Sequence, residues 1–292
     1  MFKFKPENLI KQNQLGKGGF GEVYPYRTKD SPRGDKWVVK VQTIRYEKIP
    51  SIMQEIAIGF DCPHPNILPV KGFDIIPSQM KDGLAIDWNV YMKLPRMQGS
   101  LKAKLEQHIA KGEYIPVSDI WKYFYGIACG LAYLHEKKIA HSDIKPDNIL
   151  LDKDGTVKIC DVGLAKYLEN ESGTYVNVNG GTPDYLAPEI IEKGNKLKKD
   201  ELCQADLWSL GITILELCSL KQGRIEIFAT TSKKEEEVAK QIGRLKSQYS
   251  NLRDLLSKLL KCDPNHRISV KELVKQLKEL NVLKSNNISL KD

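Results

Sequence analysis

Residues 141–151, H-S-D-I-K-P-D-N-I-L-L, constrain this chain more than any other stretch of its length. They place an acid, an amine and an amide at Asp143, Lys145 and Asn148, and a D-V-G triplet opens shortly afterwards with a second acid, Asp161. Each side chain alone would be ordinary in a surface loop. Together they provide a base for a hydroxyl, a cation for a phosphate and two oxygen ligands for Mg²⁺, which are the parts that phosphoryl transfer needs.

The composition is that of a folded globular protein. The chain has 292 residues, of which 41% are hydrophobic and 28% charged, and this length suits one large domain or two lobes that share an active site. No apolar run approaches the roughly 18–20 residues of a membrane span, and the first residues, M-F-K-F-K-P-E-N, lack the apolar segment of a signal peptide. We therefore expect an intracellular protein, in the cytoplasm, without a membrane span.

Cysteine spacing and net charge limit the kinds of metal site and binding partner that this chain is expected to have. The six cysteines include no C-x-x-C pair and no Cys/His cluster with zinc-ligand spacing, so we expect reduced thiols. The formal net charge is +8, but Lys and Arg are spread along the chain without a long basic block. A solvated basic surface that suits acidic partners is thus favoured over nucleic-acid or membrane binding, and the oligomeric state stays open.

The first part of the chain is rich in strand patterns. The S-x-x-Q sequence from Ser51 to Gln54 has the form of a capping box and predicts the start of a helix that carries Glu55. Strands are predicted over 16–26 (two strands joined by a turn), 36–43 and 88–94.

The rest of the chain is helical. One predicted helix leads directly into the 141–151 stretch, and its apolar positions repeat about every 3.6 residues, at Ile120, Phe124, Ile127, Leu131 and Leu134. Further helices are predicted over 202–220, 234–247, 251–261 and 269–280. We therefore predict an α+β fold with two lobes over 9–94 and 95–280, followed by a tail over 281–292. A cleft between lobes is a common place for a ligand.

Residues 15–23, L-G-K-G-G-F-G-E-V, carry a G-x-G-x-x-G spacing at Gly16, Gly18 and Gly21. Without side chains, backbone N–H groups can approach phosphate oxygens closely. In a dinucleotide-binding unit these glycines would lead into a helix, whereas the residues after Gly21 predict another strand. A plain hairpin turn is the alternative to a phosphate-binding loop.

These motifs together resemble those of eukaryotic protein kinases. The glycine loop, W-V-V-K ending at Lys40, the 141–151 loop and D-V-G stand where the family has its Gly-rich loop, V-A-I-K, catalytic loop and D-F-G. The resemblance runs from about Leu15 to about Leu277. It implies a bilobal protein-kinase-like fold, with ATP and Mg²⁺ as cofactors.

The resemblance also implies a role for each site residue. Asp143 accepts the proton of the substrate hydroxyl, and Lys145 stabilises the transferring phosphate. Asn148 and Asp161 bind Mg²⁺. The residues that it implies for nucleotide binding are Leu15, Gly16, Gly18, Gly21, Val23, Val38, Lys40 and Leu150.

Lys40 is implied to neutralise the α and β phosphates and to pair with a helix glutamate. Glu55 is the predicted partner. The competitor, Glu47, sits just before Pro50 and outside the predicted helix. The gatekeeper position over the nucleotide falls on Met92 or Lys93, and the spacing leaves this choice open.

Four positions depart from the family pattern. Ser142 replaces the Arg that often precedes the catalytic acid and binds phosphate on the activation loop. Val162 replaces Phe in D-F-G, and Val38, in the place of Ala, narrows the nucleotide pocket. Gly59 stands where an apolar side chain usually completes a stack behind the helix, so that contact is expected to stay open or to be completed by a partner.

The segment 181–189, G-T-P-D-Y-L-A-P-E, resembles the end of the activation segment in serine/threonine kinases. Thr182 is therefore expected to hydrogen-bond near Asp143 and Lys145. By the same resemblance, Asp206 is expected to brace the catalytic loop. Glu189, the last residue of this segment, is expected to form an ion pair with the distant Arg267.

We therefore predict an ATP-dependent serine/threonine protein kinase that transfers the γ-phosphate to a protein Ser or Thr hydroxyl, with Asp143 as the base. One alternative is a pseudokinase that acts as a binding or scaffold module, which the departures at Gly59, Val38 and Val162 support. The other is a small-molecule kinase of the same fold, against which Thr182 and the A-P-E sequence argue.

Overall fold

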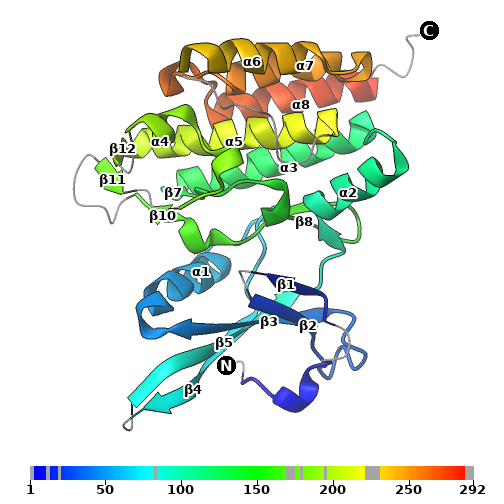
Figure 1. The fold of residues 1–292 in the computed structure, drawn as a ribbon. Helices are drawn as coiled ribbons and strands as arrows, with labels where there is room; N and C mark the ends of the chain where they lie inside the picture. The colour runs from blue at the N-terminus through cyan, green and yellow to red at the C-terminus, as the bar shows by residue number, and fades with distance from the viewer. Residues whose placement is uncertain are drawn as a thin grey trace. The chain divides into compact units, whose positions relative to one another are not determined.

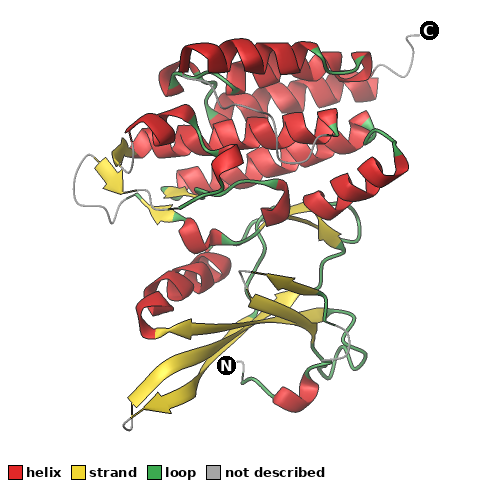
Figure 2. Cartoon of the chain, in the orientation of Figure 1, coloured by secondary structure: helices red, strands yellow, loops and turns green. Residues whose placement is uncertain are grey.

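The computed structural model describes residues 3–10, 14–18, 21–81, 84–168, 175–177, 180–193, 196–220 and 231–286. The chain divides into two compact units. The first comprises Met1–Gln98 together with Asp161–Gly163, and the second comprises Gly99–Cys160 and Leu164–Asp292. The short D-V-G segment thus belongs to the first unit although it lies far along the chain. Figures 1 and 2 show the elements of each unit.

The first unit contains an antiparallel sheet with strand order β1-β2-β3-β5-β4 and one α-helix, α1 (Figure 1). Its elements are β1 (Gly16–Gly18), β2 (Gly21–Pro25), β3 (Trp37–Arg45), α1 (Ile49–Asp61), β4 (Gly72–Lys81) and β5 (Leu84–Pro95). The predicted strands are confirmed. Sequence patterns missed β4, because Pro77 lies inside it and the pairing register with β5 shifts on either side of Gln79.

Apolar residues on the two faces of the sheet build the core of the first unit. Ile52 and Ile56, four residues apart on α1, pack with Val90 and Met92, which alternate on β5. Val39 of β3 is fully buried in a second cluster on the opposite face. The helix that carries Glu55 is thereby packed onto the sheet.

Helix α1 carries Glu55, as predicted, but it begins three residues earlier than a cap at Ser51 requires, so the predicted cap position is wrong. Pro50 is the second helical residue, where its fixed φ suits the helix and its missing N–H group is not needed. Ser51 therefore lies inside the first turn, and its hydroxyl donates to the carbonyl of Gly163 at 3.0 Å. Glu47 belongs to a separate short 3₁₀ helix, Tyr46–Lys48, outside α1 as predicted.

The second unit is mainly helical, as Figure 2 shows. Its helices are α2 (Leu101–Lys111), α3 (Val117–Glu136), α4 (Pro188–Lys193), α5 (Lys199–Ser219), α6 (Thr231–Gly243), α7 (Ser250–Leu259) and α8 (Val270–Asn286). Short strands form the sheets β6-β8-β9, β7-β10 and β11-β12. Their bounds are β6 (Gly99–Ser100), β7 (Ile139–Ala140), β8 (Ile149–Leu151), β9 (Val157–Ile159), β10 (Lys166–Tyr167), β11 (Tyr175–Asn177) and β12 (Lys196–Lys198).

Helices α3 and α5 form the centre of the second unit. All five apolar residues that predicted α3 are fully buried, and α5 is buried around most of its circumference from Leu202 to Cys218. The other predicted helices are also confirmed. Helix α2 was missed because it buries only Leu101 and Leu105, which is too few residues for a clear periodic pattern.

Two compositional expectations can be compared with the structure. All six cysteines are free in the structure, and the expectation of reduced thiols stays a prediction. Within the described ranges, none of the helices has both the length and the apolar character needed to cross a bilayer.

Candidate active site

The glycine motif forms the β1–β2 hairpin, in which Gly16 pairs with Val23 and Gly18 with Gly21. The motif leads from strand to strand, as predicted, and not into a helix. Gly21 has a φ of +105°, and a Cβ atom there would collide with the backbone carbonyl of Val41. Only glycine therefore fits this position. Gly19 and Phe20 lie outside the described residues.

Lys40 and Glu55 form the predicted ion pair. The Lys40 Nζ to Glu55 Oε1 distance is 2.7 Å, and the two side chains are 10% and 11% exposed. Lys40 lies opposite Val23 of β2 and Met92 of β5, so these three side chains share one face of the sheet. Lys93 lies on the other face, where its Nζ is 4.3 Å from the centroid of the Trp37 ring. Of the two candidates for the gatekeeper position, Met92 thus lies on the Lys40 face of the sheet and Lys93 on the opposite face.

The other predicted nucleotide-binding residues are divided between the two units. The N–H group of Leu15 donates to the carbonyl of Val23 at 2.8 Å, and the Leu15 side chain is 46% exposed. Val38 is buried and pairs with Leu94 of β5. Leu150 lies in β8 of the second unit and is half-buried.

The D-V-G segment adjoins Glu55 within the first unit. A Cβ atom on Gly163 would lie 3.6 Å from Asp161 Oδ1 and 3.7 Å from Glu55 Oε2. Asp161 has a φ of +60°, in the left-handed region, and Val162 is buried. The first unit therefore brings Lys40, Glu55 and Asp161 into one neighbourhood.

The expectation that Gly59 leaves an open contact is wrong. A Cβ atom at Gly59 would collide with Val70 Cγ2 and lie 3.0 Å from Val70 Cβ. The Val70 N–H group also donates to the Gly59 carbonyl at 3.0 Å. The space behind α1 is thus filled by a side chain of the same unit, which sequence reasoning could not assign because Val70 follows the helix in a loop.

Asp143 lies at the centre of a hydrogen-bond network in the second unit. Its Oδ1 accepts from the Thr182 N–H group at 3.0 Å and from the Thr182 hydroxyl at 2.8 Å. Its Oδ2 accepts from Lys145 Nζ at 2.7 Å and from Asn148 Nδ2 at 2.8 Å. Lys145 also donates to the Thr182 hydroxyl at 2.6 Å, so the predicted Thr182 contacts are confirmed.

The electrostatics of this network keep Asp143 ionised. Burial alone would raise the pKa of its carboxyl group. The hydrogen bonds from Lys145 and Thr182, with the positive charge of Lys145 and the bond from Asn148, outweigh burial and hold the pKa below 3.8. A carboxylate in this state can accept a proton at neutral pH.

Asp206 braces the loop that carries Asp143, as predicted. Its carboxylate accepts from the backbone N–H groups of His141 and Ser142, each at 2.8 Å, and Asp206 Oδ2 is 2.9 Å from His135 Nε2. Ser142 has a φ of +68°. Because the side chain at position 142 takes no part in this backbone contact, Ser can replace Arg here without loss of the brace.

Sequence reasoning missed His135 as a partner of Asp206. It continues the buried stripe of α3 at four-residue spacing after Ile127 and Leu131. A polar residue in such an apolar stripe is a signal that could have indicated a buried hydrogen bond.

Glu189 and Arg267 form the predicted ion pair with two contacts of 2.6 Å. Their side chains are 2% and 0% exposed. The Arg267 guanidinium also lies 5.2 Å from the centroid of the Trp208 ring on α5. The ion pair joins α4 to the segment that follows α7. Both residues lie far from the catalytic loop in the sequence.

The family assignment follows from comparison with known proteins. Residues 9–277 match the family model for the protein kinase domain. The chain belongs to the protein kinase family. This match confirms the predicted family and its α+β fold, and members of the family generally use ATP and Mg²⁺.

Curated relatives agree with the family. The chain is 29% identical over 288 residues to CBL-interacting protein kinase 26 of Oryza sativa subsp. japonica, covering 94% of this chain and 53% of the rice protein. It is 31% identical over 272 residues to an Aurora kinase of Patiria pectinifera, covering 89% and 60%. It is 29% identical over 277 residues to the serine/threonine-protein kinase Nek1 of Mus musculus, covering 92% and 21%. The chain thus spans between about a fifth and three fifths of these relatives.

The side chains of this kinase-family chain offer oxygen ligands of the kind that Mg²⁺ prefers. Asn148 Nδ2 donates to the backbone carbonyl and to Oδ2 of Asp143, each at 2.8 Å. Its Oδ1 is therefore the amide atom that could bind a metal ion. Asp161 supplies a carboxylate in the first unit. The donor chemistry of each residue fits the metal that the family uses.

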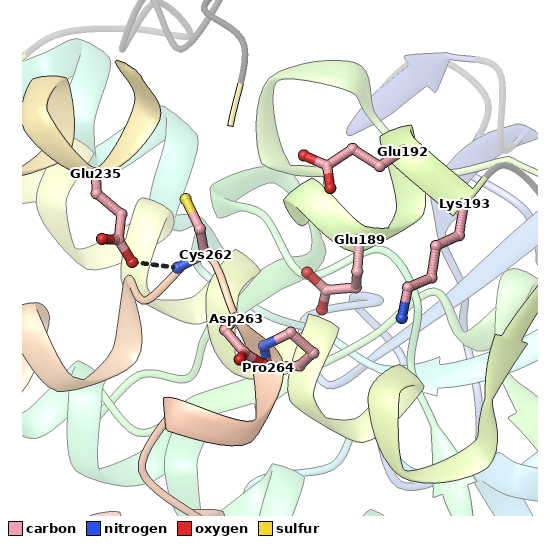
Figure 3. Close-up of a pocket in the computed structure, with 7 residues that line it drawn as sticks. All are labelled: Glu189, Glu192, Lys193, Glu235, Cys262, Asp263 and Pro264. Carbon is pink, nitrogen blue, oxygen red and sulfur yellow. Dashed lines mark hydrogen bonds between the residues drawn. The ribbon is translucent and has the colours of Figure 1, made fainter. Parts of the chain in front are cut away.

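A cavity of about 470 Å³ lies elsewhere in the second unit (Figure 3). It is lined by Glu189, Glu192, Lys193, Glu235, Cys262, Asp263 and Pro264. Glu189 binds Arg267, and Glu235 accepts from the Cys262 N–H group at 3.1 Å, as the dashed line shows. The lining includes none of the residues predicted for catalysis or nucleotide binding, so the cavity is a separate feature of the unit.

Proposed function

We propose that this chain is an ATP-dependent serine/threonine protein kinase that transfers the γ-phosphate of ATP to a Ser or Thr hydroxyl of a protein substrate. The observation that carries the proposal is the network around Asp143. An ionised carboxylate, a lysine, an amide and a threonine hydroxyl meet within hydrogen-bond distance. This is the arrangement that a base, a phosphate-binding cation and a metal ligand require.

Asp143 takes the proton of the substrate hydroxyl in this proposal. A carboxylate offers about four acceptor positions, and Lys145, Asn148 and two donors of Thr182 already use both of its oxygens. The substrate hydroxyl must therefore replace one donor. Rotation of the Thr182 side chain about its Cα–Cβ bond would move the hydroxyl away from Oδ1, so we propose that this hydroxyl yields its position to the substrate.

The remaining charged residues act on the phosphates. Lys145 stabilises the charge of the transferring phosphate, and Lys40, held by Glu55, neutralises the α and β phosphates. Bound Mg²⁺ supplies further charge neutralisation, with Asn148 and Asp161 as its proposed ligands. The residues proposed to contact the nucleotide are Leu15, Gly16, Gly18, Gly21, Val23, Val38, Lys40 and Leu150.

Preference for Ser and Thr is proposed from Thr182 and Lys145. Their contact of 2.6 Å ties the segment over 181–189 to the catalytic loop, and Nek1 is named a serine/threonine-protein kinase. We place the activity in the cytoplasm, in keeping with six free thiols. A kinase domain over 9–280 is part of the proposal, and α8 itself continues to Asn286.

Ser142 bears on regulation of the proposed kinase. The position lacks the guanidinium that would bind phosphate on the activation segment, so we propose that phosphate there has little effect on activity. Ser172 and Thr174 lie outside the described residues, and Tyr175 begins β11. Phosphatase treatment should leave activity near its starting value, and a large loss would refute this part of the proposal.

The proposal can be tested with a degenerate peptide library and ATP labelled on the γ-phosphate. We expect label on Ser and Thr peptides, and none on peptides whose only hydroxyl is Tyr. Binding of ATP with Mg²⁺ but no transfer to any peptide would favour the pseudokinase alternative. Label on a small molecule, with none on peptides, would favour the small-molecule kinase.

A further inference from the structure

Ser51 links helix α1 to the D-V-G segment inside the first unit. Its hydroxyl donates to the Gly163 carbonyl at 3.0 Å, although the two residues are 112 positions apart. Ser51 is the third residue of α1. The family pattern assigns no role to this serine, and the sequence alone suggested only a helix cap.

The D-V-G segment has a conformation that needs support. Asp161 has a φ of +60°, a region that L-residues rarely adopt, although Asp tolerates it better than most. Such conformations persist where the surroundings hold them. Burial of Val162 holds the middle of the segment, and the Ser51 hydroxyl binds its last carbonyl.

The face of α1 that carries Ser51 also carries Glu55. The two residues are four positions apart, so they lie one above the other on the helix. Glu55 Oε1 binds Lys40 Nζ at 2.7 Å, and a Cβ atom on Gly163 would lie 3.7 Å from Glu55 Oε2. One helical face therefore contacts both the lysine proposed for the phosphates and the segment that bears Asp161.

We propose that Ser51 is a positioning residue that sets the Asp161 carboxylate for Mg²⁺. The inference rests on the proposed function, because Asp161 matters as a metal ligand only if the chain binds ATP with Mg²⁺. Loss of the hydroxyl frees the Gly163 carbonyl and lets the segment leave the conformation that Asp161 requires. More Mg²⁺ is then needed to fill the site, while the chemistry of the filled site is unchanged.

A purely structural role for Ser51 makes a different prediction. In this alternative, Ser51 affects the protein only through its contribution to the stability of helix α1. Ala is a better helix former than Ser, so Ser51→Ala would then leave α1 equally or more stable. Thr at this position keeps the hydroxyl. Comparison of Ser51→Ala with Ser51→Thr therefore distinguishes a positioning role of the hydroxyl from an effect on helix stability.

The experiment compares these two variants with wild type and with Ser118→Ala. Ser118 is an exposed serine in the first turn of α3, so it controls for the loss of a serine hydroxyl near a helix start. Three quantities are measured: the Mg²⁺ concentration at half-maximal phosphate transfer, kcat at saturating Mg²⁺, and amide hydrogen exchange of the 161–163 segment in the ligand-free protein.

For Ser51→Ala we expect the half-maximal Mg²⁺ concentration and the exchange rate of 161–163 each to rise roughly three- to tenfold, the range of one neutral hydrogen bond. We expect kcat at saturating Mg²⁺ to stay within about twofold of wild type, as for an interaction that only affects binding. Ser51→Thr should give values close to those of wild type, and Ser118→Ala should match wild type in all three quantities.

Unchanged Mg²⁺ dependence and exchange in Ser51→Ala would overturn the inference. So would equal effects of Ala and Thr, because the hydroxyl would then not be the cause. Failure of the proposed function gives a different result, since wild type itself would transfer no phosphate. In that case faster exchange of 161–163 in Ser51→Ala alone would still support the contact, and unchanged exchange would refute it.

Discussion

The two units of this chain hold their proposed catalytic residues in different ways. In the second unit, Asp143 accepts four hydrogen bonds and Asp206 three, and both carboxylates are almost fully buried. In the first unit, the described contacts of the site include the ion pair between Lys40 and Glu55 and the hydrogen bond from the Ser51 hydroxyl to the Gly163 carbonyl, and the Lys40 and Glu55 side chains are 10% and 11% exposed. We infer that removing one partner of a buried charge contact costs more stability in the second unit than in the first.

The largest expected effect on stability comes from the buried ion pair of the second unit. Arg267→Ala should lower the free energy of unfolding by about 3–5 kcal/mol, because it leaves Glu189 buried without its partner. Lys40→Ala should cost less than half as much, since its pair is more exposed. Urea unfolding of both variants measures the difference.

Arg267→Lys serves as the control for this comparison, because it keeps the charge but not the two parallel hydrogen bonds. We expect its loss of stability to fall between wild type and Arg267→Ala. Equal losses for Arg267→Ala and Lys40→Ala would contradict the contrast between the units.

A smaller effect is expected where the first unit is tightly packed. Gly59→Ala should destabilise the chain by about 1–3 kcal/mol, because the added methyl group collides with Val70. Val70→Ala removes that collision, so the double variant should be more stable than the sum of the single changes predicts. Unfolding of all four proteins gives the coupling energy. A coupling of zero would show that Val70 does not fill the space beside Gly59.

The smallest effect concerns acid stability. The folded-state pKa of Asp143 is below its ordinary value of 3.8, so the ionised group stabilises the fold above that pH. This contribution is lost as the pH falls through the folded-state pKa. The stability of wild type relative to Asp143→Asn should therefore be highest near neutral pH and decline below 3.8. A relative stability that rises on acidification would mean that the pKa is raised.

Local patterns predicted the parts of the site that lie close together in sequence. The offsets from Asp143 to Asn148 are short, so the loop geometry follows from the residues themselves. Regular periodicity likewise predicted α3. The Lys40–Glu55 pair spans only one strand and one helix, and family resemblance was enough to propose it.

The features that were missed depend on contacts between distant segments. Val70 fills the space at Gly59, and Ser51 binds Gly163, although neither pair shows a periodic signal. Strand β4 escaped detection because Pro77 and two register shifts break its alternation. Such contacts are decided by tertiary packing, which local propensity does not describe.

The most direct test of the central claim compares wild type with Asp143→Asn in one experiment. Transfer of labelled γ-phosphate to a Ser/Thr peptide and binding of ATP with Mg²⁺ are measured on both proteins. Asn keeps the shape of the side chain but cannot take the substrate proton, so we expect transfer to fall by roughly 10²–10⁴-fold, with ATP binding retained. Undiminished transfer by Asp143→Asn would contradict the assignment of Asp143 as the base.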